Sequence, residues 1–471
     1  MNRINPDGQN NIASMRKAAQ ACAHRHLFHM MPPQGWTNDP NGFVYYSGSY
    51  HLFYQHNPYA AQFGIIHWGH AKSADLVRWE PLPVALAPDQ PYDAGGCFSG
   101  SSVVHNGKLY VFYTGNDKDS IQTQCLAISE DGLHFQKYEN NPVIAAPPEA
   151  VKPTQFRDPC VFRRGERFYM VVGAENKGCR GQVIVYISDD LLNWSYLNTI
   201  TAGDDTLGYM WECPNLFFQD DRAVLILSPQ GITGYPQFNS SHDSGYFVGH
   251  FDEATGAFTH GGFHKLDPGF DFYAPQIAAN IPDRSVITAW MSTWETPAPT
   301  SAHHWAGSMI LPREVRVKGD RLLFAPVREI EKYLKPVIAV GAVSGGELPP
   351  LEAAAGRLRV SAENKDFTIR LFCSADGREY TEISYSADIC AINLDLSHSG
   401  EAARGTRSVT LEYAPDILDI YLDRSSVEVF INGGEYVMTA RVFPHQGSSG
   451  IRILGEAVFQ NVSLWGFAVH P

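Results

Sequence analysis

Apolar residues in this chain gather in short runs between polar turns, and five of these runs share one design. In each, a turn rich in Gly, Asn, Asp or Ser precedes five to eight positions that carry mostly bulky apolar side chains. Runs of this length between turn residues are typical of β-strands. The five segments recur at intervals of 55 to 62 residues and occupy residues 47–55, 106–115, 165–174, 220–230 and 283–292.

A second motif follows the first in successive copies. It has the form Ser-x-Asp with an aromatic residue four positions after the Asp, and it occurs at Ser73–Trp79, Ser129–Phe135 and Ser188–Trp194, with a degenerate copy at 251–258. A unit of about four short strands that recurs at a fixed spacing is typical of a propeller blade. The sequence therefore predicts an all-β fold with a five-bladed β-propeller over residues 25–333.

The repeat stops after Tyr333. Residues 334–356 are rich in Gly, Pro and Ala, which predicts a linker with at most one strand. Short alternating strands resume over residues 357–471 without the blade pattern, and Asn432-Gly433 is typical of a hairpin tip, so we expect a C-terminal β-sandwich. Residues 1–24 form an N-terminal extension, and a helix is expected only near residues 11–25.

Composition and charge narrow the possible partners. Apolar residues make up 44% of the chain and charged residues 18%, so the chain can bury a large core. The net charge of −14 opposes a nucleic acid or an anionic membrane as the main partner. No run approaches the roughly 18 apolar residues of a membrane helix. The oligomeric state cannot be inferred from the sequence.

The N-terminal residues are polar and lack the apolar stretch of a secretion signal. The eight cysteines are scattered and contain no Cys-x-x-Cys pair. We therefore expect a cytoplasmic protein with reduced thiols, and the alternative is a secreted protein whose signal has been removed.

The turns before the propeller strands carry the candidate catalytic residues. Asp39, Ser99, Asp158, Glu212 and Tyr273 are separated by 54 to 61 residues, so they should occupy equivalent positions in successive blades. The innermost strands of a propeller lie side by side around its axis. We therefore expect these five side chains, three of them carboxylic, to meet in one central funnel.

Each acid also has a simpler explanation. Residues 38–42 form an ordinary turn sequence, Arg157 and Asp158 could be a local ion pair, and Glu212 could be a surface acid. These interpretations do not explain why the three acids occupy matching positions in the repeat, or why each is followed by Pro one or two residues later. Converging carboxylates repel each other, which is costly unless a function uses them. Two such groups on either side of a glycosidic bond can hydrolyse it.

The neighbouring residues suggest a charge state for each acid. Glu212 lies between Trp211 and Cys213, an apolar setting that favours a protonated carboxyl group. Arg157 would favour the ionised form of Asp158 if the two side chains pair. Asp39 lies in a polar turn, which suits an ionised nucleophile.

Metal and cofactor motifs are not apparent in the sequence. The pairs His67 and His70, and His303 and His304, lack a third ligand at a recognised spacing. There is no phosphate-binding loop, dinucleotide fingerprint or G-x-S-x-G motif. We expect neither a metal nor a cofactor.

At the candidate residues the chain resembles glycoside hydrolase family 32, the β-fructofuranosidases. The matching motifs span nearly the whole chain in family order. They include WTNDPNG (36–42), YHLFYQHNP (50–58), residues 67–86, CFSGSS (97–102), FRDPCVF (156–162), WECPNLF (211–217), DFYAPQ (271–276), residues 305–314 and LDRSSVEVFING (422–433).

The resemblance implies a five-bladed propeller with a β-sandwich, and retaining hydrolysis of terminal β-fructosides. It implies that Asp39 is the nucleophile, Glu212 the general acid/base and Asp158 the transition-state stabiliser. The other pocket residues it implies are Asn38, Gln55, Phe63, Phe98, Ser99, Arg157, Tyr273 and Trp290. Two positions depart from the family: Thr37 replaces a usual Met, and Phe63 replaces a common Trp, so this wall lacks an indole N–H.

The expected substrate is a small carbohydrate, sucrose or sucrose 6-phosphate. A fructosyltransferase or a fructan hydrolase would use the same acids. A non-catalytic propeller that binds carbohydrate is the alternative from another class of protein.

Overall fold

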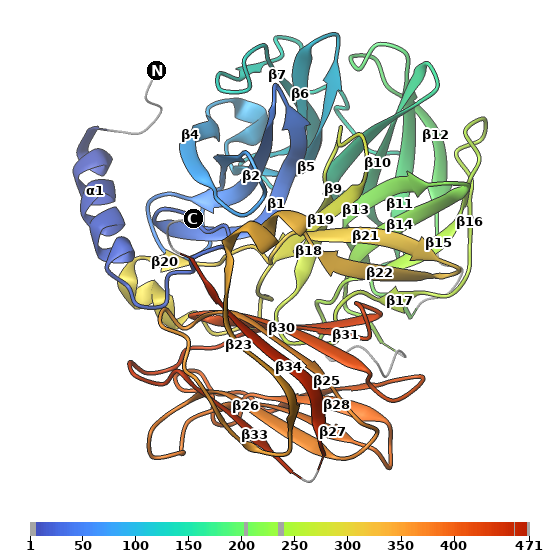
Figure 1. Cartoon of the computed structure of the whole chain (residues 1–471). Coiled ribbons are helices and arrows are strands. Elements are labelled where there is room, and N and C mark those ends of the chain that lie inside the picture. Colours follow the sequence, from blue (N-terminus) through green and yellow to red (C-terminus); the bar gives the residue numbers. More distant parts are fainter. Residues whose placement is uncertain (1–5, 202–205, 234–239, 456, 469–471) are drawn as a thin grey trace.

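The computed structural model describes residues 6–201, 206–233, 240–455 and 457–468, and β-strands dominate them. Figure 1 shows two bodies, with the blue-to-yellow sheets of the first part of the chain above the orange-to-red sheets of the second. The expected all-β fold, a propeller followed by a sandwich, is confirmed. The described helical segments are α1 (Pro6–Gln20) and the 3₁₀ turns η1 (Pro91–Asp93), η2 (Pro299–His303) and η3 (Arg328–Tyr333).

Five sheets make up the described part of the propeller, and in each of them successive strands along the chain pair mostly as antiparallel neighbours. The first contains β1 (Gly35–Tyr46), β2 (Ser49–Asn57), β3 (His67–Ser73), β4 (Glu80–Leu86) and β20 (Trp305–Ala306). The second contains β5 (Gly96–His105), β6 (Lys108–Asn116), β7 (Gln122–Ser129) and β8 (Gln136–Lys137). The third contains β9 (Val151–Arg164), β10 (Arg167–Asn176), β11 (Gly181–Ser188) and β12 (Ser195–Ile200).

The last two propeller sheets follow the same plan. The fourth contains β13 (Met210–Gln219), β14 (Arg222–Gln230), β15 (Gly245–Phe251), β16 (Phe258–His260) and β17 (His264–Lys265). The fifth contains β18 (Tyr273–Ile277), β19 (Ser285–Trp290), β21 (Arg313–Lys318) and β22 (Arg321–Pro326).

The first strand of each sheet lies at the centre of the propeller. β1 contacts β5, β5 contacts β9, β9 contacts β13, β13 contacts β18, and β18 contacts β1, so these strands form a closed ring. Strand β20, which comes from the end of the propeller, pairs with β1 in parallel and completes the first sheet. Closure of the ring therefore joins residues about 270 positions apart in the chain.

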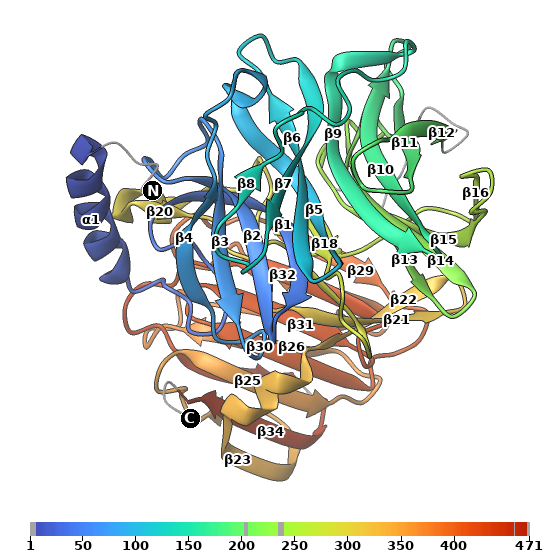
Figure 2. The ribbon, with the colours of Figure 1, turned by 90° about the horizontal axis from the view of Figure 1, so that it is seen from above.

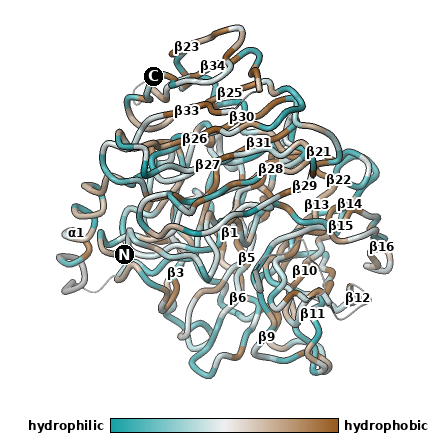
Figure 3. Tube along the Cα trace, turned by 90° about the horizontal axis from the view of Figure 1, so that it is seen from below, coloured by the Kyte–Doolittle hydropathy of each residue, from teal (hydrophilic) through white to brown (hydrophobic). Residues whose placement is uncertain are grey.

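Apolar side chains fill the spaces between neighbouring sheets. Between the first two sheets, Phe53 and Trp68 pack with Val111 and Tyr113, and all four are buried. Figure 3 shows hydrophobic stretches along the strands of both domains. Packing of apolar side chains therefore holds neighbouring sheets of the propeller together.

The repeated Ser-x-Asp motif forms the turn after the third strand of a blade. In the first copy, Ser73 Oγ accepts a hydrogen bond from the backbone N of Leu76 at 2.8 Å, and Asp75 Oδ1 accepts one from the N of Val77 at 3.0 Å. The aromatic residue that ends the copy, Trp79, packs against the propeller core. The motif recurs because each of these turns must satisfy the same backbone donors.

Two six-stranded sheets form the sandwich. One contains β23 (Leu334–Val343), β34 (Phe459–Phe467), β25 (Ala355–Ser361), β30 (Ile417–Asp423), β31 (Ser426–Ile431) and β32 (Tyr436–Arg441). The other contains β24 (Gly346–Leu348), β33 (Gly450–Leu454), β26 (Phe367–Cys373), β27 (Thr381–Ser386), β28 (Ala391–Asp395) and β29 (Thr406–Thr410). Their facing side chains form one apolar core.

The expected linker at residues 334–356 is wrong in part. This segment contains β23 and β24, and β23 pairs with β34 from Leu334 to Val343. It is an edge strand, which tolerates Pro336 because a proline there removes no hydrogen bond from the interior of the sheet. The sandwich therefore begins directly after η3.

Helix α1 lies on the flank of the propeller in both Figure 1 and Figure 2. It contacts η2, and its buried Ala19 packs with Cys22 on Trp305. The expected helix in the N-terminal extension is confirmed, although it ends at Gln20 and not at Arg25. No described helix is both long and apolar enough to cross a membrane.

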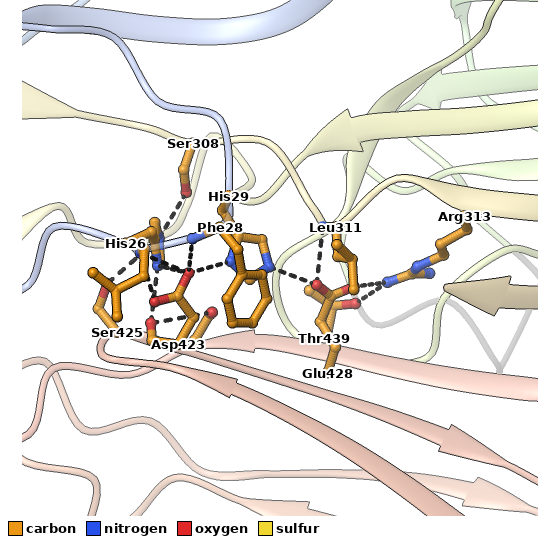
Figure 4. A network of polar contacts seen from close by, with 12 residues as sticks. His26, Phe28, His29, Ser308, Leu311, Arg313, Asp423, Ser425, Glu428 and Thr439 are labelled. Atoms are coloured by element: carbon orange, nitrogen blue, oxygen red, sulfur yellow. Dashed lines mark hydrogen bonds and ion pairs between the residues drawn. The ribbon is translucent and has the colours of Figure 1, made fainter. Parts of the chain in front are cut away.

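A buried group of charged side chains joins the two domains (Figure 4). His29 Nδ1 lies 2.8 Å from Asp423 Oδ2, and His29 Nε2 lies 2.8 Å from Glu428 Oε1. Arg313 of the propeller donates to Glu428 Oε2 at 2.7 Å and to Asp267 Oδ2 at 3.1 Å. Positive and negative groups thus alternate from the N-terminal segment through the sandwich to the propeller.

Candidate active site

All five inner strands lose their regular pairing at the same level, where a β-bulge interrupts each ladder. The positions left without a ladder partner are Asn38 and Asp39 in β1, Ser99 in β5, Asp158 and Pro159 in β9, Cys213 and Pro214 in β13, and Ala274 and Pro275 in β18. Bulges re-aim side chains and are common beside active sites. Here they turn five successive strands toward one central site.

The predicted equivalence of the five site residues holds to within one residue. Ser99 and Asp158 are the first bulged residues of their strands, and Asp39 is the second. Glu212 and Tyr273 are still paired and directly precede their bulges. The repeat spacing therefore located the level of the site, while the exact bulge position differs between blades.

Local sequence explains why the ladders break at this level. Pro159, Pro214 and Pro275 have no backbone N–H to give to a ladder, so each suits an unpaired position. Asp158 and Cys213 have φ of 67° and 48°, a left-handed conformation that is rare for residues other than glycine. Such strained backbone is maintained by the surrounding sheet and is common at functional sites.

Asp39 accepts hydrogen bonds from three side chains. Ser99 Oγ donates to Asp39 Oδ2 at 2.6 Å, and Asn38 Nδ2 donates to Asp39 Oδ1 at 3.0 Å. The thiol of Cys213 donates to Asp39 Oδ2 at 3.5 Å. Trp36 Nε1 in turn donates to Asn38 Oδ1 at 2.8 Å, which fixes the orientation of that amide. The carboxyl group of Asp39 is thus held in one orientation.

Asp158 lies beside Asp39, and Cys213 bridges the two. The backbone N of Cys213 donates to Asp158 Oδ2 at 2.9 Å, and its thiol lies 3.6 Å from the same oxygen. The thiol is therefore within reach of both carboxyl groups at once. Because Glu212 directly precedes Cys213 in β13, the third acid belongs to the same site.

Glu212 has a polar environment, contrary to the expected apolar one. Arg157 donates to Glu212 Oε1 from Nη2 at 2.9 Å and from Nε at 3.1 Å. The phenol of Tyr273 donates to Glu212 Oε2 at 2.6 Å. The suggested contact of Arg157 with Asp158 was therefore assigned to the wrong acid, because the guanidinium group reaches across to the neighbouring blade.

The pKa values of two acids are raised by the site. Burial, followed by the charge of Glu212, raises the pKa of Asp39 to about 6, although Ser99, Asn38 and Cys213 oppose this. Burial also raises the pKa of Asp158 to about 7, against the opposing charge of Arg157. Arg157 does favour the ionised form of Asp158, as expected, but burial outweighs its charge. The polar turn expected around Asp39 does not keep its pKa low either, since the side chain is packed at the centre of the ring.

A second layer of polar side chains closes the ring beneath the acids. Gln276 donates to the carbonyl of Gly100 at 2.8 Å, and Asn215 donates to the carbonyl of Pro275 at 3.2 Å. Asn41 accepts a hydrogen bond from the N of Gly100 at 3.1 Å. A cavity of only about 10 Å³ remains among the bulged residues. The site is therefore closed at its base.

The remaining predicted pocket residues surround the acids at different depths. Gln55 is buried and donates to the carbonyl of Cys97 at 3.0 Å. Phe98 is half-buried next to Ser99. Trp290 is buried, and its indole Nε1 has no hydrogen-bond partner in the described part of the chain. Phe63 lies further out with 48% of its surface exposed, at the mouth of the site.

Three residues of this site were not predicted as site residues. Cys213 and Trp36 lay inside the quoted motifs, but neither carries a charge that would single it out. Trp294 lies outside those motifs, and its ring contacts Phe63 at 5.4 Å between centroids. Only the cross-blade contacts identify these residues, and a single sequence does not contain them.

The fold and the site together define a class of protein. Three carboxyl groups converge at the centre of a propeller, and hydrolysis of a glycosidic bond requires at least two such groups on either side of that bond. The protein is a glycoside hydrolase.

Comparison with known proteins identifies the family. The models named "Glycosyl hydrolases family 32 N-terminal domain" and "Glycosyl hydrolases family 32 C terminal" match residues 29–326 and 339–466. The chain therefore belongs to glycosyl hydrolase family 32. It is 38% identical to a sucrose-6-phosphate hydrolase of Bacillus subtilis over 95% of both chains, and 38% identical to a raffinose invertase of Escherichia coli over 93% of this chain and 94% of that one.

Solved structures agree with this assignment. A sucrose-6-phosphate hydrolase from Lactobacillus gasseri superposes with a TM-score of 0.91 at 29% identity, covering 98% of this chain and 96% of that one. A mutant β-fructofuranosidase from Bombyx mori in complex with sucrose superposes with a TM-score of 0.83 at 30% identity, covering 98% of this chain and 97% of that one.

Proposed function

We propose that the protein hydrolyses the terminal β-D-fructofuranosyl unit of sucrose and of sucrose 6-phosphate, with retention of configuration. The observation that carries this proposal is the meeting of Asp39, Asp158 and Glu212 at the bulges of three inner strands. The names of the relatives support the choice of substrate, since they include sucrose-6-phosphate hydrolases and an invertase.

Asp39 acts as the nucleophile in this proposal. Its ionised carboxylate attacks the anomeric carbon of the fructosyl unit and forms a covalent fructosyl-enzyme. Hydrogen bonds from Ser99 and Asn38 hold the carboxylate in position. They also stabilise its charge before attack, which opposes the effect of burial.

Glu212 acts as the general acid and then as the general base. In its protonated form it gives its proton to the oxygen that leaves with the glucosyl unit, and as a carboxylate it later takes a proton from the attacking water. Arg157 and Tyr273 hold its two oxygens and fix its orientation.

Asp158 stabilises the transition state by accepting hydrogen bonds from fructosyl hydroxyl groups. In the free site it lies within a cluster of carboxyl groups, and its pKa is raised to about 7. Hydroxyl donors of a bound sugar would favour its ionised form. Its hydrogen bond from the backbone of Cys213 ties it to the strand that carries Glu212.

The first test is the stereochemistry of the products. A retaining enzyme needs its two catalytic carboxyl groups about 5–5.5 Å apart and releases fructose with the configuration of the substrate. NMR of the first product should show β-fructofuranose. An inverted first product would exclude Asp39 as a nucleophile.

Removal of Asp39 and removal of Glu212 should affect the activity in different ways. Asp39→Ala should abolish turnover of every fructoside, because no covalent intermediate can form. Glu212→Ala should lose most activity on sucrose but retain more on a fructoside with an activated leaving group, which needs no proton. Equal losses on both substrates would contradict the role of Glu212, and sucrose cleavage by Asp39→Ala would favour a non-catalytic role for that residue.

We also propose that the enzyme works in the cytoplasm. Sucrose 6-phosphate is charged, so it does not cross a membrane unaided and is available to an enzyme on the side where it is formed. Cell fractionation tests this point. Recovery of the activity from the culture medium of intact cells would contradict it.

A further inference from the structure

Three residues of the inner strands have a left-handed backbone at the level of the site. Asp158 in β9, Cys213 in β13 and Ala274 in β18 have φ of 67°, 48° and 49°. Each directly follows the last paired residue before the bulge of its strand. Residues other than glycine rarely adopt this conformation, so the surrounding structure has to hold it in place. The partners of these three backbone N–H groups therefore decide how the neighbouring acids are held.

A threonine of the second blade holds Asp158. Thr114 in β6 is fully buried, and its Oγ1 accepts a hydrogen bond from the backbone N of Asp158 at 2.9 Å. The same hydroxyl donates to Gln124 Oε1 at 2.8 Å, and Gln124 Nε2 donates to the carbonyl of Phe156 at 2.9 Å. Two buried side chains of the second blade therefore hold the backbone of the third blade at two points, on Asp158 and two residues before it.

A serine of the fourth blade makes the same contact with the fifth. Ser228 in β14 is also fully buried, and its Oγ accepts a hydrogen bond from the backbone N of Ala274 at 3.2 Å. Its hydroxyl oxygen lies 2.8 Å from that of Ser244. The phenol oxygen of Tyr273, which donates to Glu212, lies 3.2 Å from the carbonyl oxygen of Ser228. Ser228 thus holds both Tyr273 and the residue that follows it.

Thr114 and Ser228 occupy equivalent positions in their blades. Each lies in the second strand, opposite the last paired residue before the bulge of the first strand, which is Phe98 for Thr114 and Glu212 for Ser228. In both cases the next blade presents the backbone N–H of its left-handed residue to the hydroxyl. The shared register indicates that the two hydroxyls serve the same purpose.

The third blade departs from this pattern. Its equivalent residue is Gly173, which offers no side chain. A β-carbon there would lie 2.0 Å from the carbonyl oxygen of Trp211, so the space is closed to a hydroxyl-bearing side chain. The backbone N of Cys213, in the next blade, donates instead to Asp158 Oδ2 at 2.9 Å. Asp158 thus takes the place of the hydroxyl, which ties its carboxylate to β13.

We propose that Thr114 and Ser228 are positioning residues for the acids of this site. Thr114 fixes the backbone from which Asp158 meets the fructosyl unit, and Ser228 fixes Tyr273 and, through it, Glu212. The inference rests on the proposed function, because it assigns support to the acids of that reaction. Both side chains are fully buried, so they act through these residues and not on the sugar itself.

Thr114→Val tests the first contact, because it keeps the shape of the side chain and removes the hydroxyl. It should lower kcat for sucrose about tenfold with little change in KM, since the carboxyl group of Asp158 moves from the place where the transition state needs it. The loss should be equal on p-nitrophenyl β-D-fructofuranoside, which carries the same fructosyl unit. Thr114→Ser should restore most of the activity, because it keeps the hydroxyl.

A double variant separates positioning from a general loss of stability. In an Asp158→Asn background the carboxylate is already gone, so Thr114→Val should cause little further loss of activity. A further loss as large as in the wild-type background would show that Thr114 acts elsewhere. That result would overturn its assignment, as would a wild-type kcat in Thr114→Val alone.

Ser228→Ala should give a different pattern on the same two substrates. It should lower kcat for sucrose more than for the p-nitrophenyl fructoside, whose activated leaving group needs no proton from Glu212. Equal losses on both substrates, or no loss on either, would overturn the assignment of Ser228.

Thr381→Val is the matched control, because Thr381 is a buried threonine of the sandwich whose hydroxyl oxygen lies 2.8 Å from that of Ser399. It should leave kcat unchanged on both substrates, and a loss equal to that in Thr114→Val would contradict positioning. A wild type that cleaves neither fructoside would contradict the proposed function. The crystal structure of Thr114→Val is a readout that does not depend on the substrate: Asp158 should leave the left-handed region, and an unchanged backbone there would overturn the inference.

Discussion

Asp39 is surrounded by groups that act on its charge in opposite directions. Burial and the charge of Glu212 raise its pKa to about 6, while hydrogen bonds from Ser99, Asn38 and Cys213 lower it. The proposed nucleophile is therefore ionised at neutral pH by a narrow margin. Each of these donors tunes the pH at which the site becomes active.

The first prediction concerns this pH dependence. The kcat/KM for sucrose should rise with pH through about 6, because only the ionised form of Asp39 attacks. Ser99→Ala removes a donor that stabilises the carboxylate, so the rising limb should move to higher pH. Rates measured from pH 4 to 8 on both proteins test this. If the rising limb of the pH profile of Ser99→Ala stayed in place or moved to lower pH, the role of Ser99 would be contradicted.

A second prediction links the same residue to stability. The folded protein binds a proton at Asp39 more tightly than the unfolded chain, so the ionised carboxylate lowers stability above about pH 4 and does so fully above about pH 6. Asp39→Asn should therefore be inactive and more stable at pH 7 by about 3 kcal/mol. Denaturant unfolding measures this difference, which should shrink toward zero near pH 4.

The exposed Asp189 provides the control for this prediction. Its side chain is 84% exposed, so Asp189→Asn should leave the unfolding free energy nearly unchanged at both pH values. If Asp39→Asn were less stable than the wild type at pH 7, the carboxylate would be stabilising, and the direction of its pKa shift would be wrong.

At the level of strands, the bulges decide where the site lies. Each inner strand leaves its ladder at the level of the acids and then resumes pairing. In β5 the residue after the bulge is Gly100, whose α-carbon lies directly against the neighbouring strand. A β-carbon at Gly100 would lie 1.9 Å from the carbonyl oxygen of Phe112. No other residue fits there unless the backbone moves.

The third prediction follows from that close approach. Gly100→Ala should lower the free energy of unfolding by about 3 kcal/mol and reduce activity, because it shifts β5 and with it Ser99. Gly261→Ala is the control, since a β-carbon at Gly261 meets no atom within 4 Å. Thermal unfolding and sucrose assays on both variants test this. Normal stability of Gly100→Ala would show that β5 can move away from β6 at little cost.

The strands themselves could be predicted from the sequence, and the bulges could not. The apolar pattern of a strand reflects which of its side chains are buried. The strands that open at residues 50, 109 and 167 are buried in a similar way in successive blades, so their apolar pattern repeats along the chain. A bulge depends on pairing with a strand elsewhere, so the repeat spacing located Glu212 and Tyr273 only to within one residue. The partner of Arg157 was missed for the same reason, since it comes from the next blade.

The linker was mispredicted for a different reason. Gly and Pro are typical of loops, and residues 334–356 are rich in both and in Ala. An edge strand accepts these residues because it pairs on one side only, and β23 pairs with β34 alone in its sheet. Composition therefore does not separate an edge strand from a linker.

The two domains form one molecule through the buried charges around His29. Burial lowers the pKa of His29, but hydrogen bonds to Asp423 and Glu428 outweigh that effect and raise it to about 9. His26 lies beside it, and burial lowers its pKa to about 3. His29 is thus a buried cation between two carboxylates, whereas His26 is neutral at pH 7.

The fourth prediction is a loss of stability at alkaline pH. A histidine whose pKa rises on folding stabilises the protein below its unfolded pKa of about 6.5 and loses that contribution as pH rises through the folded value. The unfolding free energy should therefore fall by about 2–3 kcal/mol between pH 6.5 and 9.5. Denaturant unfolding across this range measures the decrease.

Variants of two histidines locate the source of this decrease. His29→Asn should have lower stability at pH 6.5 and a flatter dependence on pH, since it removes the titrating group. His134→Asn should keep the wild-type dependence, because His134 is 86% exposed. The same slope in His29→Asn as in the wild type would assign the decrease to another group.

The contact between His29 and Glu428 also affects folding during synthesis, because its two residues are made at very different times. His29 and Glu428 are 399 residues apart, so the chain emerges from the ribosome with one half of the domain junction long before the other. At about 5–20 residues per second, the N-terminal segment waits roughly 20–80 s for its partner. During that interval Phe28 and Met30, both buried in the finished protein, have no completed sandwich to cover them. Slower translation would therefore lengthen the period in which this uncovered segment can aggregate.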